Sequence, residues 1–529
     1  MSRAEVVWLL IASLAVLVFA SLPTLYAWSL ADADHIFTGF VYNVEDGNSY
    51  LAKMRLGARG EWLFHLFYTP EEHDGAWVLL FHLLLGKLGA WMGASPVFTY
   101  HLARFVLGLG LLGMVYAFVA AMTPDITVRR LAWALVAVGS GLGWLFLLLG
   151  KAQWLGDLPL DFWVPEAYLF LVLYNLPHLA LAETLLLASL LFSYRALAGR
   201  GIRYSLYAGM ALFVMAWIVP FYTGIPVAML GAYLLSLTCR RRSIPWREVG
   251  LVAAVGLPAL PPVIYNAWVF TANPAFRLWA AQNRILSPHP LHYLAGYALL
   301  LPPAAGGTVR LLRQKDERGW LLAIWVLVVP CLLYLPFGLQ RRMGSLVQVP
   351  LALLAATGLQ GWLGEEGSRG GRRLRWGYVA VLSLSNLLLV VGSLGPIRQR
   401  AQPIYRPGAE VAALTWLAAH SRADETVLAS AGVGNVIPAW TDLRVFIGHG
   451  SETLHYREKQ GLVQRFFRPD TPDLWRRSLL DEFGIEYLFY GPQERELGGW
   501  SPATAPFLFP IYEQGGYTLY RVLPGEGQP

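Results

Sequence analysis

Two adjacent carboxylates, Glu45 and Asp46, begin a segment whose residue types suit proton transfer. The segment continues as GlyAsnSerTyrLeuAlaLysMet to residue 54, and we predict a short helix over 46–57 that stops at Gly57 and Gly60. Where water meets an apolar phase, one of two neighbouring carboxylates has a raised pKa and serves as a general base. The alternative is structural, because Asp46 before Gly-Asn-Ser is also a good N-cap.

A second group of polar residues lies farther along the chain and includes Asp161, Glu166 and His178. Residues 166–194 make about 29 helical positions, roughly 43 Å, which is longer than one membrane crossing needs. Pro177 is therefore predicted to break this stretch. His178 then begins a span and faces the helix bundle or a wet cavity rather than lipid. The alternative for His178 is a hydrogen-bonded packing residue.

Arginines stand out in two further connections. Arg284 ends the loop 273–284, and Arg341 and Arg342 come just before the apolar run that begins at Leu346. Two neighbouring guanidinium groups fit bidentate capture of a phosphate. Arginine at a membrane boundary also anchors a protein to anionic lipid headgroups with no other role, so both interpretations stay open.

Several kinds of chemistry are not indicated by any motif. The sequence contains no GxxxxGK[ST] phosphate loop, no HExxH and no Cys/His spacing suited to a metal. Cys239 and Cys331 are too few and too scattered for a disulfide framework or a zinc site. ATP hydrolysis and a zinc centre are therefore not expected.

The composition indicates which kind of structure must position these residues. Charged residues make up 14% of the 529 positions, where a soluble globular domain has about 25%. Residues 405–529 hold 26 charged residues in 125 positions, so the charges are concentrated in this last part. Lipid is the expected solvent for residues 1–404 and water for the rest. The net charge of +7 is then a membrane signature and does not indicate a nucleic-acid partner.

Residues 1–404 are predicted to form an all-α polytopic membrane bundle of eleven spans, since a crossing helix needs about 17–25 apolar residues. Most Lys and Arg of the short connections fall on one side when residues 77–92 are laid on the membrane surface as an interfacial helix. That side is cytoplasmic and includes the N-terminus, whose apolar run is a retained span rather than a signal peptide. The first outer loop runs from about Pro23 to Ser95. The spans begin near Val6, Val97, Leu131, Pro177, Tyr204, Phe221, Val249, Leu291, Gly319, Leu346 and Trp376.

Residues 405–529 are predicted to form a small α/β domain. Helical spacing covers 408–420 and 471–483, and short strands are predicted at 427–430, 444–447, 486–490 and 517–522. A cytoplasmic N-terminus and an odd number of spans make this domain extracytoplasmic.

This organisation resembles the GT-C superfamily of integral-membrane glycosyltransferases, which use polyprenyl-phosphate sugars as donors. The acidic residue Asp46, Tyr50 four positions later and the helix-ending Gly57 are similar to the pattern of that superfamily. Residues 46–57 and 77–92 match its two juxtamembrane helices. The stretch 342–356, ArgMetGly followed by an apolar run with a proline, resembles a late span of bacterial members.

The resemblance implies roles for the polar residues. Asp46, with Glu45 beside it, is the expected base or metal-linked carboxylate for the acceptor hydroxyl. An acidic residue of the second outer loop helps to shape the donor or a divalent-metal site, to which Asp46 and Asp161 are the possible ligands. This chain has Glu before Asp, the reverse of the commoner order, and no strict Asp-x-Asp, so the need for a metal is left open. The residues expected to bind substrate are Tyr50, Asp161, Glu166, His178, Arg284, Arg341 and Arg342.

We therefore expect a bacterial-type membrane glycosyltransferase that moves a sugar from a polyprenyl-phosphate donor to a glycan, lipid or protein acceptor at the extracytoplasmic face. Its other partner is membrane lipid, and nucleic acid is not a partner. A transporter or flippase for a lipid-linked saccharide is the first alternative, although the sequence shows no internal repeat. A non-catalytic envelope scaffold, in which Asp46 is only a helix cap, is the second.

Overall fold

The computed structural model describes residues 1–363 and 369–524, and the chain divides into two compact units. Unit 1 consists of Met1–Leu22, His101–Asn266 and Arg284–Gly392. Unit 2 consists of Pro23–Tyr100, Ala267–Asn283 and Ser393–Pro529. Unit 2 thus combines the first long connection, a short middle stretch and the C-terminal part of the chain. The division at residue 404 into a membrane part and an outer part stays a prediction.

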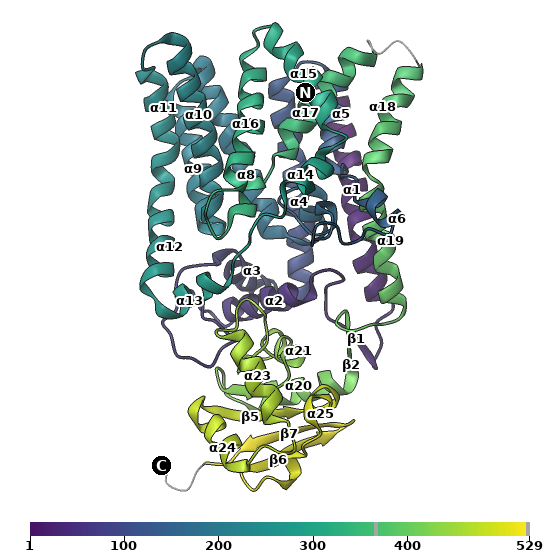
Figure 1. The fold of residues 1–529 in the computed structure, drawn as a ribbon, viewed down its shortest axis with the longest axis vertical. Coiled ribbons are helices and arrows are strands. Elements are labelled where there is room, and N and C mark those ends of the chain that lie inside the picture. The colour runs from purple at the N-terminus through teal and green to yellow at the C-terminus, as the bar shows by residue number, and fades with distance from the viewer. Residues whose placement is uncertain (364–368, 525–529) are drawn as a thin grey trace. The chain divides into compact units, whose positions relative to one another are not determined.

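Unit 1 is built from helices that follow the apolar runs of the sequence. Figure 1 shows α8, α9, α10 and α16 running side by side. The elements wholly or partly in unit 1 are α1 (Arg3–Ser29), α4 (Pro96–Met122), α5 (Ile126–Ala137), α6 (Gly143–Leu148), η1 (Leu160–Phe162), α7 (Leu169–Asn175), α8 (Pro177–Arg195), η2 (Ala196–Arg200), α9 (Ile202–Ile218), η3 (Pro220–Thr223), α10 (Gly224–Arg241), α11 (Trp246–Gly256), η4 (Leu257–Ala259), α12 (Leu260–Ala272), α14 (Pro290–Tyr297), α15 (Leu301–Arg313), α16 (Glu317–Leu333), η5 (Gln340–Gly344), α17 (Gln348–Leu363), α18 (Arg369–Leu382) and α19 (Leu384–Arg398).

Six helices of the described residues are long and apolar enough to cross a membrane, and a seventh is added if the pair α18 and α19, bent by 44°, forms one span. The other four expected spans, from Leu131, Tyr204, Leu291 and Gly319, coincide with shorter helices. The total of eleven therefore stays a prediction. The six are Arg3–Ser29, Pro96–Met122, Pro177–Arg200, Pro220–Arg241, Trp246–Ala272 and Gln340–Leu363.

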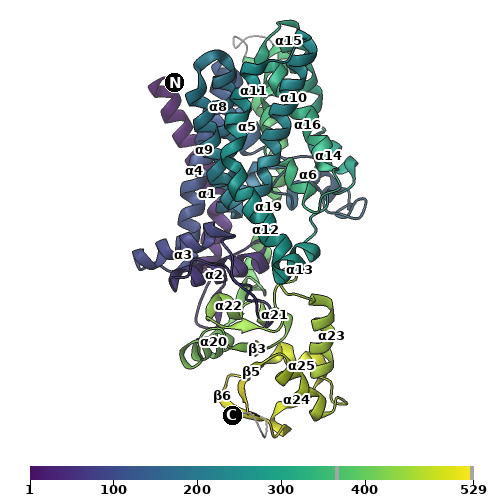
Figure 2. The same cartoon turned by 90° about the vertical axis from the view of Figure 1, so that its left-hand side faces the viewer.

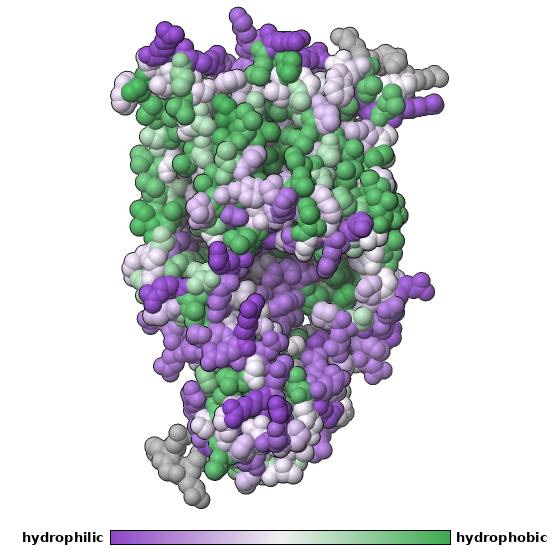
Figure 3. Space-filling model, in the orientation of Figure 1, coloured by the Kyte–Doolittle hydropathy of each residue, from purple (hydrophilic) through white to green (hydrophobic). Residues whose placement is uncertain are grey.

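The outer surface of unit 1 is apolar. Ile11, Met210 and Leu327 keep 65%, 59% and 71% of their surfaces exposed. On the face drawn in Figure 3, hydrophobic side chains cover the helices of unit 1 between more hydrophilic ends. Apolar surface of this extent is unstable in water, so the observation confirms an integral membrane protein.

One predicted helix boundary in this part of the chain is wrong and another is confirmed. The helix α1 continues through Pro23 to Ser29, so the first connection begins at Leu30 rather than near Pro23. The predicted break at Pro177 is confirmed, because α7 ends at Asn175 and α8 begins at Pro177. Proline is tolerated there because the first residue of a helix needs no backbone N–H donor.

In unit 2, α2 (Val44–Ala58) and α3 (Leu80–Met92) pack backbone to backbone. A Cβ atom on Gly57 would lie 2.0 Å from the Leu83 carbonyl oxygen, and one on Gly86 would lie 1.9 Å from the Met54 carbonyl oxygen. Only glycine permits so close an approach. The two helices predicted at 46–57 and 77–92 are therefore confirmed, with their starts shifted by two and three residues.

The C-terminal part of unit 2 contains a five-stranded mixed sheet with the strand order β4-β3-β5-β7-β6. Strands β4, β3 and β5 are parallel, whereas β7 is antiparallel to both β5 and β6. A separate two-stranded pair joins β1 (His35–Phe37) to β2 (Tyr405–Pro407). The strands of the larger sheet are β3 (Thr426–Leu428), β4 (Arg444–Val445), β5 (Ile485–Tyr490), β6 (Leu508–Gln514) and β7 (Tyr517–Val522).

Helices cover both faces of this sheet, as Figure 2 shows. One buried cluster places α20 and α22 against β3, β5 and β7, and a second places α23 and α24 against the opposite face. The predicted helices and four strands are thus found with small shifts, and β6 was not predicted. The remaining elements of unit 2 are α13 (Pro274–Gln282), α20 (Gly408–His420), α21 (Ala431–Gly434), α22 (Ile437–Trp440), α23 (Tyr456–Phe466), α24 (Asp473–Glu482), α25 (Pro492–Gly498) and η6 (Pro502–Thr504).

Candidate active site

Asp46 lies in the first turn of α2, and each of its carboxylate oxygens accepts a hydrogen bond. Oδ1 is 2.8 Å from Nε2 of His449, and Oδ2 accepts from the side-chain amide of Asn43. The N-cap position is occupied by Asn43 in the left-handed conformation, with no capping hydrogen bond from its side chain. The alternative interpretation, in which Asp46 is the N-cap, is therefore wrong. Its charge still suits the positive end of the helix dipole.

The environment of Asp46 keeps its side chain ionised. Burial raises the pKa of the carboxyl, but the hydrogen bond and charge of His449, the Asn43 amide and the charge of Lys53 lower it to about 2. The side chain nonetheless keeps 39% of its surface exposed. Asp46 is thus an accessible carboxylate, held in one orientation, that can accept a proton from a group placed against it.

His449 follows the short strand β4 and is buried beneath the carboxylate. Its Nδ1 atom accepts backbone N–H groups of Ser451 and Glu452, each at 3.3 Å. In the neutral ring Nε2 therefore carries the hydrogen and donates it to Asp46. Burial lowers the pKa of His449, and the neighbouring carboxylates of Asp46, Glu452 and Glu45 raise it above the usual value overall.

The loop 448–455, which contains His449, is fastened to α2 at two further points. The backbone N–H of Gly450 donates to Oε1 of Glu45 at 2.6 Å. Glu452 accepts from the Ser49 hydroxyl at 2.6 Å and from the Lys53 ammonium at 2.7 Å. The side chains of Lys53 and Glu452 are 2% and 8% exposed, so this is a buried ion pair.

Tyr50, one turn after Asp46, lies in an aromatic stack. Its ring is parallel to that of His82 at 4.6 Å between centroids and nearly parallel to that of Tyr100 at 5.9 Å. The Lys53 ammonium lies 5.7 Å from the centre of the same ring. Tyr50 therefore belongs to the packing that holds α2, and its expected contact with substrate stays a prediction.

Unit 1 contains a separate cluster in which Arg341 and Arg342 meet Glu166. Arg342 donates to Glu166 at 2.5 Å, and Arg341 Nε lies 3.8 Å from the other carboxylate oxygen. The Glu166 side chain is fully buried, whereas those of Arg341 and Arg342 are 14% and 24% exposed. Arg341 also lies over the Trp163 ring at 4.5 Å. The structure thus brings together three of the residues expected to bind substrate.

Another buried carboxylate of unit 1 was not predicted. Glu183, in the middle of α8, accepts the hydroxyl of Ser345 at 2.8 Å. Ser345 directly follows η5, the short helix that carries Arg341 and Arg342. Glu166 and Glu183 therefore hold the same segment, one through the arginine side chains and the other through the serine.

The remaining expected residues lie elsewhere in unit 1. The buried carboxylate of Asp161 accepts the backbone N–H groups of Gly141 and Gly143 at 3.1 and 3.0 Å, which fixes the start of α6. His178 lies at the start of α8 and is partly buried. Arg284 is exposed at the start of the third stretch of unit 1.

The described residues offer few donors for a metal. Within residues 1–363 and 369–524, no group of three or more His, Cys, Asp or Glu side chains is placed to hold an ion. Both oxygens of Asp46 already accept hydrogen bonds, and Asp161 faces backbone N–H groups. This donor set does not fit the divalent ion that the resemblance allowed, so we derive no step through a metal.

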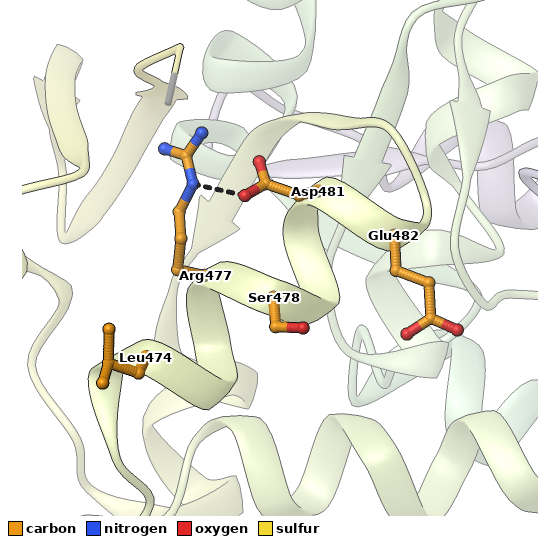
Figure 4. A pocket seen from close by; sticks show the side chains of 5 residues that line it. All are labelled: Leu474, Arg477, Ser478, Asp481 and Glu482. Atoms are coloured by element: carbon orange, nitrogen blue, oxygen red, sulfur yellow. Dashed lines mark hydrogen bonds and ion pairs between the residues drawn. The ribbon is translucent and has the colours of Figure 1, made fainter. Parts of the chain in front are cut away.

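A surface hollow over α24, drawn in Figure 4, contains none of the expected site residues. All of its lining residues come from one helix, and Arg477 is already paired with Asp481 at 2.8 Å. It is lined by Leu474, Arg477, Ser478, Asp481 and Glu482.

Three residues of the Asp46 cluster were missed by sequence reasoning, namely Lys53, His449 and Glu452. The one available signal for His449 was the segment GlyHisGly after a predicted strand, which places a titratable side chain between two residues of high backbone freedom. Lys53 stood inside the helical pattern of α2, where a surface position was the simplest interpretation.

No protein-family model and no curated protein sequence matches the chain. Among solved structures, the arabinofuranosyltransferase AftD from Mycobacteria matches with a TM-score of 0.59 and 15% identity, over 99% of this chain and 40% of that one. ArnT from Cupriavidus metallidurans, bound to undecaprenyl phosphate, matches with a TM-score of 0.53 and 13% identity over 100% of both chains.

A third solved structure is the archaeal oligosaccharyltransferase AglB from Archaeoglobus fulgidus, in complex with an inhibitory peptide and a dolichol-phosphate. It matches with a TM-score of 0.51 and 13% identity, over 100% of this chain and 75% of that one. Identities this low show the fold alone. The fold of this chain is therefore that of the GT-C glycosyltransferases, as the motifs around Asp46 and Arg342 predicted.

Proposed function

We propose that this protein is a membrane glycosyltransferase that moves a sugar from a polyprenyl-phosphate donor to a hydroxyl acceptor at the extracytoplasmic face. The observation that carries the proposal is the ionised, accessible carboxylate of Asp46, held at 2.8 Å by His449 on a helix of the GT-C fold. The fold adds support, because two solved proteins that share it were captured with undecaprenyl phosphate and dolichol-phosphate.

The reaction is a displacement at the anomeric carbon of the sugar. The acceptor oxygen forms a bond to this carbon, and the bond from the carbon to the phosphate oxygen breaks with its electron pair staying on the lipid phosphate. The proton of the acceptor hydroxyl passes to the Asp46 carboxylate. The phosphate is already a good leaving group, so the protein supplies a base for the acceptor and cations for the departing charge.

Arg341 and Arg342 are the proposed partners of the lipid phosphate. Guanidinium groups bind phosphate oxygens in pairs, and Glu166 holds the two side chains in place before the donor arrives. Their positive charges then stabilise the charge that develops on the phosphate as the sugar leaves. We assign Asp161 to bracing the loop before α6, because its carboxylate is directed at backbone N–H groups.

The proposed topology has all eleven segments crossing the membrane, with the N-terminus in the cytoplasm. The four shorter helices then cross together with their neighbours, and α3 lies on the membrane surface. A position at the membrane surface suits α3, because Leu84, Leu88 and Trp91 are exposed while Leu83 and Leu85 are buried. Residues 405–529 are then extracytoplasmic.

The test is sugar transfer by the purified protein in lipid from a panel of radiolabelled polyprenyl-phosphate sugars, comparing wild type with Asp46→Asn. Asparagine keeps an oxygen for the His449 hydrogen bond, so the fold is expected to hold while transfer falls by about 10²- to 10⁴-fold. The matched control is Asp470→Asn, which removes an exposed carboxylate paired with Arg468 and should leave transfer unchanged.

Three results would contradict the proposal. If Asp46→Asn transfers sugar at the wild-type rate, Asp46 is not the base. If the wild type moves lipid-linked saccharide between the leaflets of liposomes and transfers no sugar, the protein is a flippase. If the wild type neither transfers sugar from any donor in the panel nor moves lipid-linked saccharide between leaflets, the result favours the envelope scaffold.

A further inference from the structure

The C-terminal sheet contributes a side chain to the Asp46 site through the loop 448–455. We propose that His449 is a positioning residue that fixes the Asp46 carboxylate for catalysis, so that the C-terminal part of unit 2 completes the active site. The inference rests on the proposed function and adds a role for a part of the chain to which no motif gave one. His449 acts through Asp46 and has no assigned contact with substrate.

The hydrogen bonds at Nδ1 decide what the imidazole can do. Nδ1 accepts the backbone N–H groups of Ser451 and Glu452, and the Ser451 hydroxyl lies 3.2 Å from the same atom. Nε2 therefore holds its own hydrogen and offers it to Asp46 Oδ1. In this tautomer neither nitrogen is open to receive the acceptor's proton. The ring orients the carboxylate, and the proton stays with Asp46 until solvent removes it.

The loop that carries His449 is rigidly held. Thr453 closes it from within, because its N–H donates to the His449 carbonyl at 2.9 Å and its hydroxyl accepts the Gly448 N–H at 3.1 Å. Glu452 fastens it to Ser49 and Lys53 of α2. The Thr453 carbonyl also accepts a hydrogen bond from the side chain of Gln282, the last residue of α13, at 3.0 Å.

The residue before His449 must be glycine for the loop to approach. A Cβ atom on Gly448 would lie 2.5 Å from the Tyr68 ring and 2.7 Å from the Gly434 carbonyl oxygen. Tyr68 in turn donates its hydroxyl to the Asn435 carbonyl at 3.1 Å, and Asn435 donates to the carbonyl of Glu45 at 3.2 Å. Backbone and side chain thus converge on the first turn of α2, which carries Asp46.

Two substitutions of His449 separate its contact with Asp46 from its role in the loop. In His449→Asn the side-chain oxygen replaces Nδ1 as acceptor for the Ser451 and Glu452 N–H groups, but the shorter side chain does not reach Asp46. In His449→Gln the terminal amide extends to the place of Nε2 and donates to Asp46. Both variants keep a neutral polar side chain, so each serves as the folding control for the other.

The experiment measures kcat and KM for sugar transfer in wild type and both variants. We expect His449→Asn to lose about 10- to 100-fold in kcat, because a hydrogen bond to a charged group is removed, with KM for the acceptor unchanged. We expect His449→Gln to recover most of that loss. Equal kcat values in wild type and His449→Asn would overturn the inference, and so would a kcat as low in His449→Gln as in His449→Asn when both variants melt at the wild-type temperature.

A spectroscopic readout makes the result independent of the proposed function. In protein labelled with ¹⁵N-histidine, the Nε2–H signal of His449 is assigned by its loss in His449→Gln and followed in Asp46→Asn. A shift of that signal supports the hydrogen bond even when no donor supports transfer. An unchanged Nε2–H signal in Asp46→Asn shows that His449 does not hold Asp46 and overturns the inference, whether or not the wild type transfers sugar.

Discussion

Replacing Lys53 with methionine should release the loop 448–455 from α2. The ammonium and the Glu452 carboxylate are 2.7 Å apart and almost fully buried, so methionine leaves a buried charge whose main partner is gone. At an effective dielectric constant of about 20 the lost attraction is about 6 kcal/mol, and desolvation of the ions offsets part of it. The net cost of breaking a buried pair on one side is about 3–5 kcal/mol.

The assay is hydrogen exchange of the backbone amides of residues 448–455 in detergent, which reports the free energy of local opening without global unfolding. A cost of this size accelerates exchange by about 150- to 5,000-fold where opening limits it. The double variant Lys53→Met, Glu452→Gln should recover much of the protection, because it removes both charges. Lys151→Met, at an exposed lysine, is the matched control and should leave exchange in this loop unchanged.

The pH dependence gives the prediction a definite sign. In the wild type, burial raises the pKa of Glu452, but the charges of Lys53 and His449 lower it by more, so the folded-state pKa lies below the unfolded-state pKa. The ionised carboxylate therefore stabilises the fold at pH values above the unfolded-state pKa, and this stabilisation is lost as the pH falls through the folded-state pKa. In Lys53→Met the lowering charge of the lysine is absent and burial raises the pKa of Glu452. The variant is then least stable at high pH, and the difference in stability between it and the wild type shrinks as the pH falls from 7 towards 5. A deficit independent of pH, or unchanged exchange in Lys53→Met, would refute the reasoning.

Two further predictions concern the packing of α3 against α2 and the charge of Asp46. Gly86→Ala places a Cβ atom 1.9 Å from the Met54 carbonyl oxygen, so we expect a loss of about 1–3 kcal/mol in stability; thermal unfolding in detergent checks this against Gly110→Ala, where nothing lies within 4 Å. Because the pKa of Asp46 is lowered to about 2, its charge is lost only as the pH falls towards that value, so transfer measured from pH 4 to 8 should show no acid limb from Asp46. An acid limb in this range that disappears in Asp46→Glu would count against the assigned pKa.

The parts of the fold that the sequence predicted are those decided by local pattern. The helix α2 followed from the polar start and glycine stop of residues 46–57, and α3 followed from the apolar run 77–92. Pro177 broke the long apolar run because proline removes a backbone donor. The strand β6 was missed because it is the exposed edge of the sheet and contains Pro510, which interrupts the alternating pattern. The number of spans is less well determined by sequence, since short apolar helices such as α5 fall below the length of a single crossing.

Only the residues of the candidate site that lie together in one short motif could be predicted from the sequence. Glu45 and Asp46 are adjacent, and their place at the start of a helix could be inferred from the residues around them. His449 and Glu452 come from another part of the chain, and their pairing with Asp46 and Lys53 depends on tertiary contacts that no local spacing records. Glu183 was hidden for a related reason, because a single carboxylate in an apolar run interrupts the hydropathy without indicating its partner Ser345.

The 403 residues that separate Asp46 from His449 also determine when during synthesis the site can exist. At about 5–20 residues per second, the ribosome needs about 20–80 s to reach the histidine after it has passed the aspartate. Throughout that interval α2 is already made, but its carboxylate lacks the group that orients it. Under the proposed mechanism the carboxylate is therefore oriented for catalysis only once the last quarter of the polypeptide is being made, after residues 1–404 have left the ribosome.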